Sequence, residues 1–171
     1  CLMKAIAVVD KNWGIGKEGG LLFSLPADMK FFRETTTGAT VVMGKKTLAS
    51  FPGGRPLKNR TNIVIDSKCL HDGCVTVKNL DELFAVLNDV KGEVYVIGGA
   101  MTYRSLLPYC EEALITKVDA SGGADVFLDN LEKLPQWSMT SMSEPVETNG
   151  YTIRFTVYRN NRVLSPVSEK K

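Results

Sequence analysis

The sequence predicts a single α/β domain with a mixed, mainly parallel sheet of about eight strands, about four flanking helices and a C-terminal antiparallel hairpin. Short runs rich in Val and Ile recur along the chain, and several are apolar without alternation, which is typical of strands buried on both faces. Helical patterns separate these runs, and such alternation indicates parallel neighbours joined by right-handed crossovers. The last third of the chain changes to an alternating pattern that follows a turn sequence.

The predicted elements follow from these patterns in order. Strands are expected at 5–9, 40–43, 62–65, 75–77, 94–97, 114–118 and 152–158. Helices are expected at 26–36, 45–50, 80–90 and 100–107. Residues 137–146 and the alternating 152–158 flank Thr148-Asn149-Gly150, which predicts an antiparallel hairpin at a sheet edge. We expect the domain to cover 3–160, with 1–2 and 161–171 as terminal extensions.

Composition restricts the possible partners. The 171 residues are 44% hydrophobic and 23% charged with a net charge of +2, so nothing global favours nucleic acid or a membrane surface, and an anion site would be local. The chain shows no apolar run of transmembrane length and no secretory signal pattern, and Cys1-Leu2 before Met3 resembles a processing remnant. We therefore expect a cytoplasmic monomer without membrane or nucleic-acid partners.

The cysteine and histidine content argues against a metal site. The chain has four cysteines and one histidine, His71, and no CxxC pair, so a zinc site of ordinary spacing is not expected. The cysteines at 1, 69, 74 and 110 are expected to be free thiols, although a disulfide between Cys69 and Cys74 stays open.

Asp28 allows two interpretations. With Pro26 at the first helical position, Asp28 is third, where a carboxylate helps to cap a helix and meets its dipole favourably. It also lies on the shoulder of an apolar stripe that includes Leu25, Met29 and Phe32, so the alternative is a charge placed inside a pocket.

Two other kinds of segment are candidates for ligand binding. Residues 13–20 (WGIGKEGG) follow the first strand and are either a plain loop or a lid over a site, but they lack the GxGxxG pattern. Strands also stop at Gly44, before Lys45 and Lys46, and at Gly98-Gly99. Lys45 and Lys46 are explained either as solvated surface residues or as part of an anion site, and Gly98-Gly99 either as a tight turn or as a phosphate-binding turn. Two such strand ends at the same end of the sheet would suit a ligand with two phosphates.

A cationic connection lies between 54 and 61. Its basic residues are Arg55, Lys58 and Arg60. They are either solvated surface residues or include an arginine that binds a ligand carboxylate.

Taken together, these stretches resemble the dihydrofolate reductase family. Its motifs occur in order as WGIG at 13–16, LPAD at 25–28, MGKKT at 43–47, GRPLKNRTN at 54–62 and VIGGAMTY at 96–103. The resemblance spans Met3 to about Arg159 and implies an oxidoreductase that reduces 7,8-dihydrofolate to tetrahydrofolate. In this reaction NADPH is the hydride donor to C6, and a proton reaches N5.

The resemblance also implies site residues. Asp28 is implied as the catalytic carboxylate, accepting the pterin N3–H and 2-amino hydrogens. Its apolar surroundings are expected to raise its pKa. The substrate residues implied are Ile6, Val8, Asp28, Met29, Phe32, Leu57, Arg55, Arg60 and Thr116, with Thr116 bracing Asp28 and Arg60 taking the glutamate carboxylate. The cofactor residues implied are Ala7, Gly14, Ile15, Gly16, Lys17, Glu18, Gly19, Gly20, Leu21, Gly44, Lys45, Lys46, Thr47, Ile65, Asp66, Ser67, Lys78, Ile97, Gly98, Gly99, Ala100, Met101, Thr102 and Tyr103.

Several positions depart from the family pattern. Leu22-Phe23 replaces the usual Pro-Trp, and Leu48 replaces a Trp. Asp66 puts a carboxylate beside Ser67, where its charge would need Lys45 or Lys68 to offset it, and Met101 replaces a cation. Two rival functions are a pyrimidine reductase of the same fold in riboflavin synthesis and a nucleotide-binding module without turnover.

Overall fold

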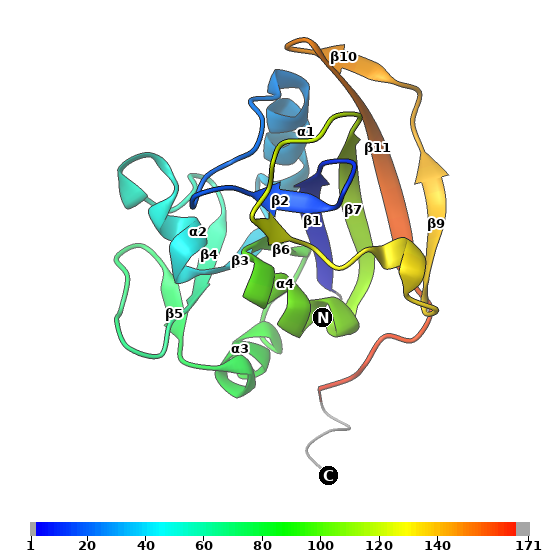
Figure 1. Cartoon of the computed structure of the whole chain (residues 1–171). Coiled ribbons are helices and arrows are strands. Elements are labelled where there is room, and N and C mark those ends of the chain that lie inside the picture. The colour runs from blue at the N-terminus through cyan, green and yellow to red at the C-terminus, as the bar shows by residue number, and fades with distance from the viewer. Residues whose placement is uncertain (1–2, 167–171) are drawn as a thin grey trace.

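The computed structural model describes residues 3–166 and contains one main sheet (Figure 1). The strands run in the spatial order β10-β11-β7-β1-β6-β3-β4-β5, and β9 pairs with β11 beside this path. Their bounds are β1 (Met3–Val9), β3 (Thr40–Gly44), β4 (Thr61–Ile65), β5 (Val75–Val77), β6 (Val94–Gly98), β7 (Cys110–Val118), β9 (Trp137–Met142), β10 (Val146–Thr148) and β11 (Tyr151–Asn160).

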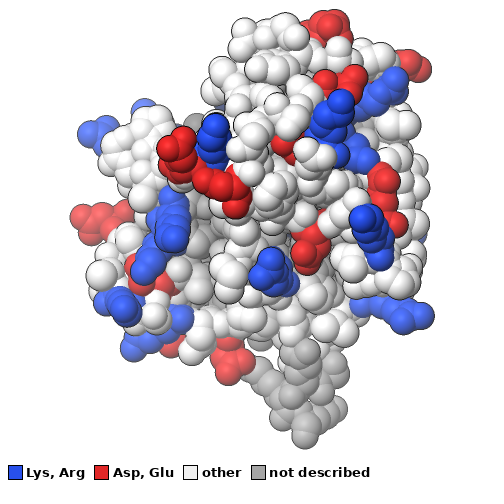
Figure 2. Space-filling view, viewed as in Figure 1, with Lys and Arg blue, Asp and Glu red and all other residues white. Residues whose placement is uncertain are grey.

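In the described part of the chain, four α-helices accompany the sheet: α1 (Pro26–Thr36), α2 (Lys45–Ala49), α3 (Leu80–Leu87) and α4 (Ala100–Leu106). Short 3₁₀ turns occur at Pro52–Gly54, Leu107–Tyr109 and Leu131–Lys133. Acidic and basic side chains are interspersed over the face shown in Figure 2. Within residues 3–166, no helix is long and apolar enough to cross a membrane.

The pairing of the strands confirms the predicted mixed sheet. β1 is parallel to β6 and β7, β3 is parallel to β4 and β6, and β4 is parallel to β5. β11 is antiparallel to β7, β9 and β10. β9 and β10 pair with successive parts of β11, so both lie at the same edge of the sheet.

The C-terminal hairpin is also confirmed, and its turn follows from its sequence. Asn149 has φ 49° and Gly150 has φ 81°, so both turn residues are left-handed, as a type I′ hairpin requires. Asn and Gly are the residues that adopt this conformation at least cost, and the twist of such a turn matches that of its strands.

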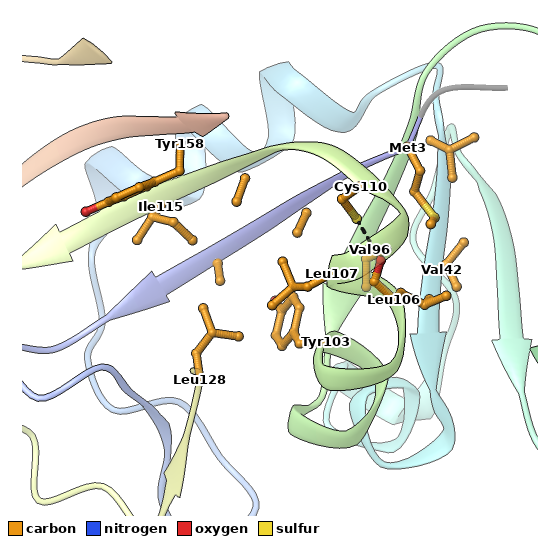
Figure 3. Packing of buried hydrophobic residues seen from close by; sticks show 14 of the residues in the cluster. Met3, Val42, Val96, Tyr103, Leu106, Leu107, Cys110, Ile115, Leu128 and Tyr158 are labelled. Atoms are coloured by element: carbon orange, nitrogen blue, oxygen red, sulfur yellow. Dashed lines mark hydrogen bonds between the residues drawn. The ribbon is translucent and has the colours of Figure 1, made fainter. Parts of the chain in front are cut away.

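The central strands are buried on both faces. On β1, Ala5, Ala7 and Val9 pack into a core with Leu83 of α3 and Leu106 of α4, whereas Ile6 and Val8 point to the opposite face. Phe31 and Phe32 of α1 and Leu48 of α2 cover that opposite face. Figure 3 shows the first core, including the hydrogen bond from Cys110 Sγ to the Leu106 carbonyl at 3.3 Å.

The sequence prediction was wrong at two places. The helix predicted at 80–90 ends at Leu87, because the hydrogen bonds beyond it span three residues instead of four. Asp89 N–H donates to the Val86 carbonyl, and Val90 N–H donates to the Leu87 carbonyl. The glycine-rich segment contains a short strand, β2 (Gly14–Gly16), which pairs with β8 (Val126–Phe127). Its partner lies more than a hundred residues away, so local sequence carries no signal for this pairing.

Three of the four cysteines can be compared with the prediction. Cys69, Cys74 and Cys110 are free thiols, as expected, and Cys1 lies outside the described residues.

We expect Leu106→Ala to lower the free energy of unfolding by about 2–5 kcal/mol, because Leu106 is fully buried and its loss leaves a cavity. Urea unfolding monitored by circular dichroism would measure this. Leu70→Ala is the matched control, since Leu70 is 88% exposed and should change stability by no more than about 0.5 kcal/mol. Equal effects of the two substitutions would contradict the assigned core.

Candidate active site

Asp28 faces the sheet from the first turn of α1. Its Oδ1 accepts a hydrogen bond of 2.6 Å from Thr116 Oγ1 on β7. The N-cap residue of α1, Leu25, contributes no side-chain cap. The carboxylate is therefore engaged across the space between helix and sheet, which favours the pocket interpretation of this residue over the capping one.

The space beside Asp28 is a small, largely apolar hollow that is open to solvent. It is lined by Val8, Ile15, Leu21, Leu22, Phe23, Leu25, Asp28 and Met29. Burial raises the pKa of Asp28, and the Thr116 hydrogen bond partly opposes that rise. An apolar hollow with one convergent polar group has the usual character of a small-molecule site.

The C-terminal hairpin holds the start of α1. Thr148 Oγ1 accepts from the Ala27 N–H at 3.1 Å, and Asn149 Nδ2 donates to the Ser24 carbonyl at 2.9 Å. Phe23 packs edge-on against Tyr151 with ring centroids 4.8 Å apart. These contacts join residues more than 120 positions apart, so the sequence analysis missed all of them.

The Arg60 guanidinium lies at the C-terminal end of α1. Arg60 Nε donates to Thr36 Oγ1 at 3.1 Å, and its guanidinium lies over the Phe32 ring at 5.9 Å from the centroid. Buried Asn62 fixes the preceding turn, because it bonds both the N–H of Leu57 (3.0 Å) and its carbonyl (2.9 Å). Arg55 is exposed and lies beside Gly53 instead.

The glycine-rich segment is anchored at its base by Asp10. This buried carboxylate accepts hydrogen bonds from the backbone N–H groups of Asn12, Gly14 and Gly122, at 2.8, 2.8 and 2.9 Å. Burial alone would raise the pKa of Asp10, but the three amides outweigh it and lower the pKa. Farther along, Asp125 Oδ2 accepts from the Glu18 N–H at 3.0 Å. The segment is thus a structured flap rather than a free loop.

The glycine turns that follow β3 and β6 lie next to each other at the carboxyl end of the sheet. This is the placement that would suit a ligand with two phosphates. A Cβ built on Gly98 would lie 2.8 Å from Thr47 Oγ1, and one on Gly44 would lie 3.0 Å from Thr102 Oγ1. Each glycine therefore admits the helix that follows the other strand. The buried Tyr103 hydroxyl donates to the Ile6 carbonyl at 2.7 Å, which joins α4 to β1.

The third strand at this edge is followed by a hydrogen-bonded carboxylate and imidazole that the sequence analysis did not anticipate. Asp66 follows β4, and its Oδ2 lies 2.8 Å from His71 Nε2. Its Oδ1 accepts from the Lys68 N–H at 2.9 Å. These bonds, with the histidine contributing most, lower the pKa of Asp66 to about 2. An acid and a histidine five residues apart gave no recognisable sequence signal.

Comparison with known proteins agrees with this geometry. The family model described as dihydrofolate reductase matches residues 2–160. The chain belongs to the dihydrofolate reductase family.

Individual relatives are similar over nearly their whole length. The dihydrofolate reductase of Bacillus subtilis (strain 168) is 32% identical, covering 92% of this chain and 94% of that protein. The Haemophilus influenzae dihydrofolate reductase is 32% identical, covering 89% and 94%. A solved dihydrofolate reductase from Enterococcus faecalis, complexed with NADP(H) and RAB-propyl, matches with a TM-score of 0.85, 30% identity and coverage of 94% and 96%.

The structure places the predicted residues in several groups. Val8, Asp28 and Met29 line the hollow, as do Ile15 and Leu21 from the predicted cofactor set. Ile6 is buried in a hydrophobic cluster against which Phe32 and Leu57 pack, and the Arg60 guanidinium lies over the Phe32 ring. Lys78 follows the edge strand β5, with its N–H bonded to Glu82. Within residues 3–166 no group of three or more metal-ligating side chains occurs.

We expect Asp28→Asn to raise the free energy of unfolding at pH 7. The pKa of Asp28 is raised in the folded protein, so the wild type loses stability as the pH rises from its ordinary value of 3.8 through the raised value. Asparagine keeps an oxygen for Thr116 and has no charge to bury. Urea titrations at several pH values should show that the difference in free energy of unfolding between the variant and the wild type becomes smaller as the pH falls toward 3.8. Asp89→Asn, at an exposed carboxylate, serves as the control. A variant less stable than the wild type at pH 7 would contradict the assigned environment.

Proposed function

We propose that this chain reduces 7,8-dihydrofolate to 5,6,7,8-tetrahydrofolate with NADPH, and that Asp28 is its catalytic residue. The single observation that carries the assignment of Asp28 is a carboxylate bonded to Thr116 in an otherwise apolar hollow. Family membership favours this reaction over a pyrimidine reductase or a binding module without turnover.

Asp28 would have two tasks. A carboxylate with one oxygen held by Thr116 has lone pairs free to accept the adjacent N3–H and 2-amino hydrogens of the pterin. Burial raises its pKa, so the carboxyl retains a proton at higher pH than an exposed aspartate would. That raised pKa suits a group that holds or organises the proton destined for N5.

The rest of the substrate would extend along α1. Ile6, Val8 and Met29 would enclose the pterin, with Phe32 and Leu57 toward the benzoyl ring. Arg60 lies at the far end of the helix, where its Nε is engaged by Thr36 and its Nη1 by the Lys58 carbonyl. The remaining guanidinium N–H groups can donate to the glutamate carboxylate, with Arg55 on the exposed side.

The carboxyl edge of the sheet fits a dinucleotide. Gly44 and Gly98 permit close packing of the two strand ends, and Lys45 and Lys46 provide cations beside them. Thr47, Ser67 and the segment 98–103 would complete the phosphate contacts, while the flap at 14–21 would cover the nicotinamide. Bound there, NADPH supplies a hydride; the chain's own residues orient the two rings and exclude water.

The functional unit would be a single copy of residues 3–160 acting in the cytoplasm.

We expect Asp28→Asn to lower turnover at neutral pH by about 10²- to 10⁴-fold, because it removes the group proposed to manage the proton. Loss of NADPH absorbance on addition of dihydrofolate would measure this, with circular dichroism as the check on folding. Asp89→Asn should retain wild-type turnover. Normal turnover by Asp28→Asn would overturn the role of Asp28. Wild-type oxidation of NADPH with a pyrimidine substrate but not with dihydrofolate would overturn the proposed reaction.

We expect Arg60→Ala to weaken dihydrofolate binding by roughly ten- to a hundredfold, because a charge-assisted hydrogen bond to the glutamate is lost. A dihydropterin without the glutamate should bind equally well to the variant and to the wild type. Arg60→Lys, which keeps the charge but not the two-pronged geometry, should fall between them. Equal weakening of both ligands by Arg60→Ala would remove Arg60 from this role.

A further inference from the structure

A bulky residue adopts a left-handed backbone conformation where the flap begins. Trp13 directly precedes β2 and has φ 64°, in the region that favours glycine and costs a large side chain conformational energy. Its carbonyl accepts from the Leu128 N–H at 2.9 Å, next to the pairing of β2 with β8. Such a conformation persists only where the surroundings hold it. The side-chain contacts of Trp13 therefore bear on how the flap leaves the sheet.

The Trp13 indole contacts both a second ring and a cation. Trp13 is 6% exposed and meets the Tyr158 ring edge-on, with centroids 5.8 Å apart. The Lys117 ammonium lies over both rings, 5.2 Å from the Trp13 centroid and 5.5 Å from that of Tyr158. Tyr158 belongs to the first core together with Ile115, which lies on the same strand as Lys117 (Figure 3). An ammonium over aromatic rings is attracted by their negative faces.

Glu132 fixes the position of this ammonium. Its Oε2 accepts from Lys117 Nζ and, at 2.6 Å, from the Tyr158 hydroxyl. These hydrogen bonds, with that of Lys117 contributing most, lower the pKa of Glu132, so its carboxylate is ionised at neutral pH. The Lys117 side chain is 29% exposed and that of Glu132 50%, so the ion pair by itself contributes little to stability. Its effect is to hold the ammonium over the rings.

The strand that supplies Lys117 also supplies the partner of Asp28. Thr116 and Lys117 are successive residues of β7, so their side chains project to opposite faces of the sheet. Thr116 donates to Asp28 on the face that α1 covers. Lys117 instead meets Trp13 on the face that α3 and α4 cover. The cluster of Trp13, Lys117, Glu132 and Tyr158 therefore acts on the flap from the face opposite Asp28.

The flap connects this cluster to the hollow. Ile15, two residues after Trp13, packs against the same core as Trp13 and also lines the hollow. Leu21, at the far end of the flap, lines the hollow as well. A displacement at Trp13 would therefore move side chains that face the ligand.

We propose that Lys117 is a positioning residue for the reaction: with Glu132 and Tyr158 it holds Trp13 in its left-handed conformation and thereby keeps the flap over the nicotinamide. The inference rests on the proposed function, in which the flap covers that ring. Lys117 touches neither substrate nor cofactor and acts only through Trp13. Without its ammonium the base of the flap opens more often, while the groups proposed to bind the adenosine phosphates stay in place.

The first measurement is hydrogen exchange of the folded protein without ligand. The amides of Asp125 and Leu128 donate to the carbonyls of Gly16 and Trp13, at 3.0 and 2.9 Å, so their exchange reports opening of the flap base. We expect Lys117→Met, which keeps an unbranched apolar side chain but no ammonium, to speed their exchange roughly fivefold. Leu106→Ala, which weakens the same core without removing the cation, should leave their exchange unchanged.

The second measurement compares two ligands that differ in the nicotinamide. We expect Lys117→Met to raise the dissociation constant of NADPH by a similar factor, because a flap that is less often in place lowers the apparent affinity. The fragment 2′-phospho-ADP-ribose lacks the nicotinamide and should bind the variant and the wild type equally. Lys117→Arg keeps a cation that can lie over the rings and bond Glu132, so it should restore NADPH binding. Lys133→Met, which removes an exposed lysine beside Glu132, should change neither ligand.

Failures of the two proposals are distinguishable. If the wild type does not bind NADPH or does not oxidise it with dihydrofolate, the proposed function fails, whatever the exchange rates show. If Lys117→Met leaves the Asp125 and Leu128 amides unchanged, or weakens both ligands equally, then Lys117 does not position the flap and the inference is overturned. The same holds if Leu106→Ala speeds these amides as much as Lys117→Met does. Circular dichroism of each variant checks that the fold is intact.

Discussion

Parallel pairing brings the carboxyl ends of β1, β6, β3 and β4 to one end of the sheet, and both proposed ligand sites lie there. Strands in this arrangement must be covered on both faces, which places α3 and α4 on one side and α1 and α2 on the other. The helices then begin at the same edge at which the strands end. Gly44 and Gly98 allow this close approach, because a side chain at either position would meet a threonine of the other's helix.

Three aspartates near this edge show how surroundings assign different roles to one residue type. Asp10 accepts three backbone N–H groups and Asp66 accepts from its loop amides and His71, so the pKa of each is lowered and each stays charged. Asp28 accepts a hydrogen bond from Thr116 in an apolar hollow, and there burial prevails, so its pKa is raised. Of the three, Asp28 is therefore the one that keeps its proton to a higher pH than an exposed aspartate does.

The position of Asp28 depends on a segment remote in sequence. The hairpin of β10 and β11 supplies Thr148 to the first turn of α1, and Tyr151 packs against Phe23 just before that helix. Phe23 thus has a packing partner although it lacks the indole N–H that the family usually carries there. The same principle applies to the flap, where Asp125 holds Glu18 across more than a hundred residues.

The sequence by itself determined the elements whose causes are local. The Val- and Ile-rich runs predicted the strands, Pro26 marked the start of α1, and Asn149-Gly150 predicted the hairpin turn, because turn geometry and hydrophobic periodicity are read within a few residues. Ordered motifs also indicated the family and the candidate residues. Only the tertiary structure decided which partner each polar group takes: Asp28 with Thr116, Ala27 with Thr148 and β2 with β8. Such pairs depend on the meeting of distant backbone segments, so no local pattern encodes them. Asp66 illustrates the difference most clearly. Lys45 or Lys68 was expected to offset its charge, and Lys45 does help to lower its pKa, but the folded loop also brings His71 to its carboxylate.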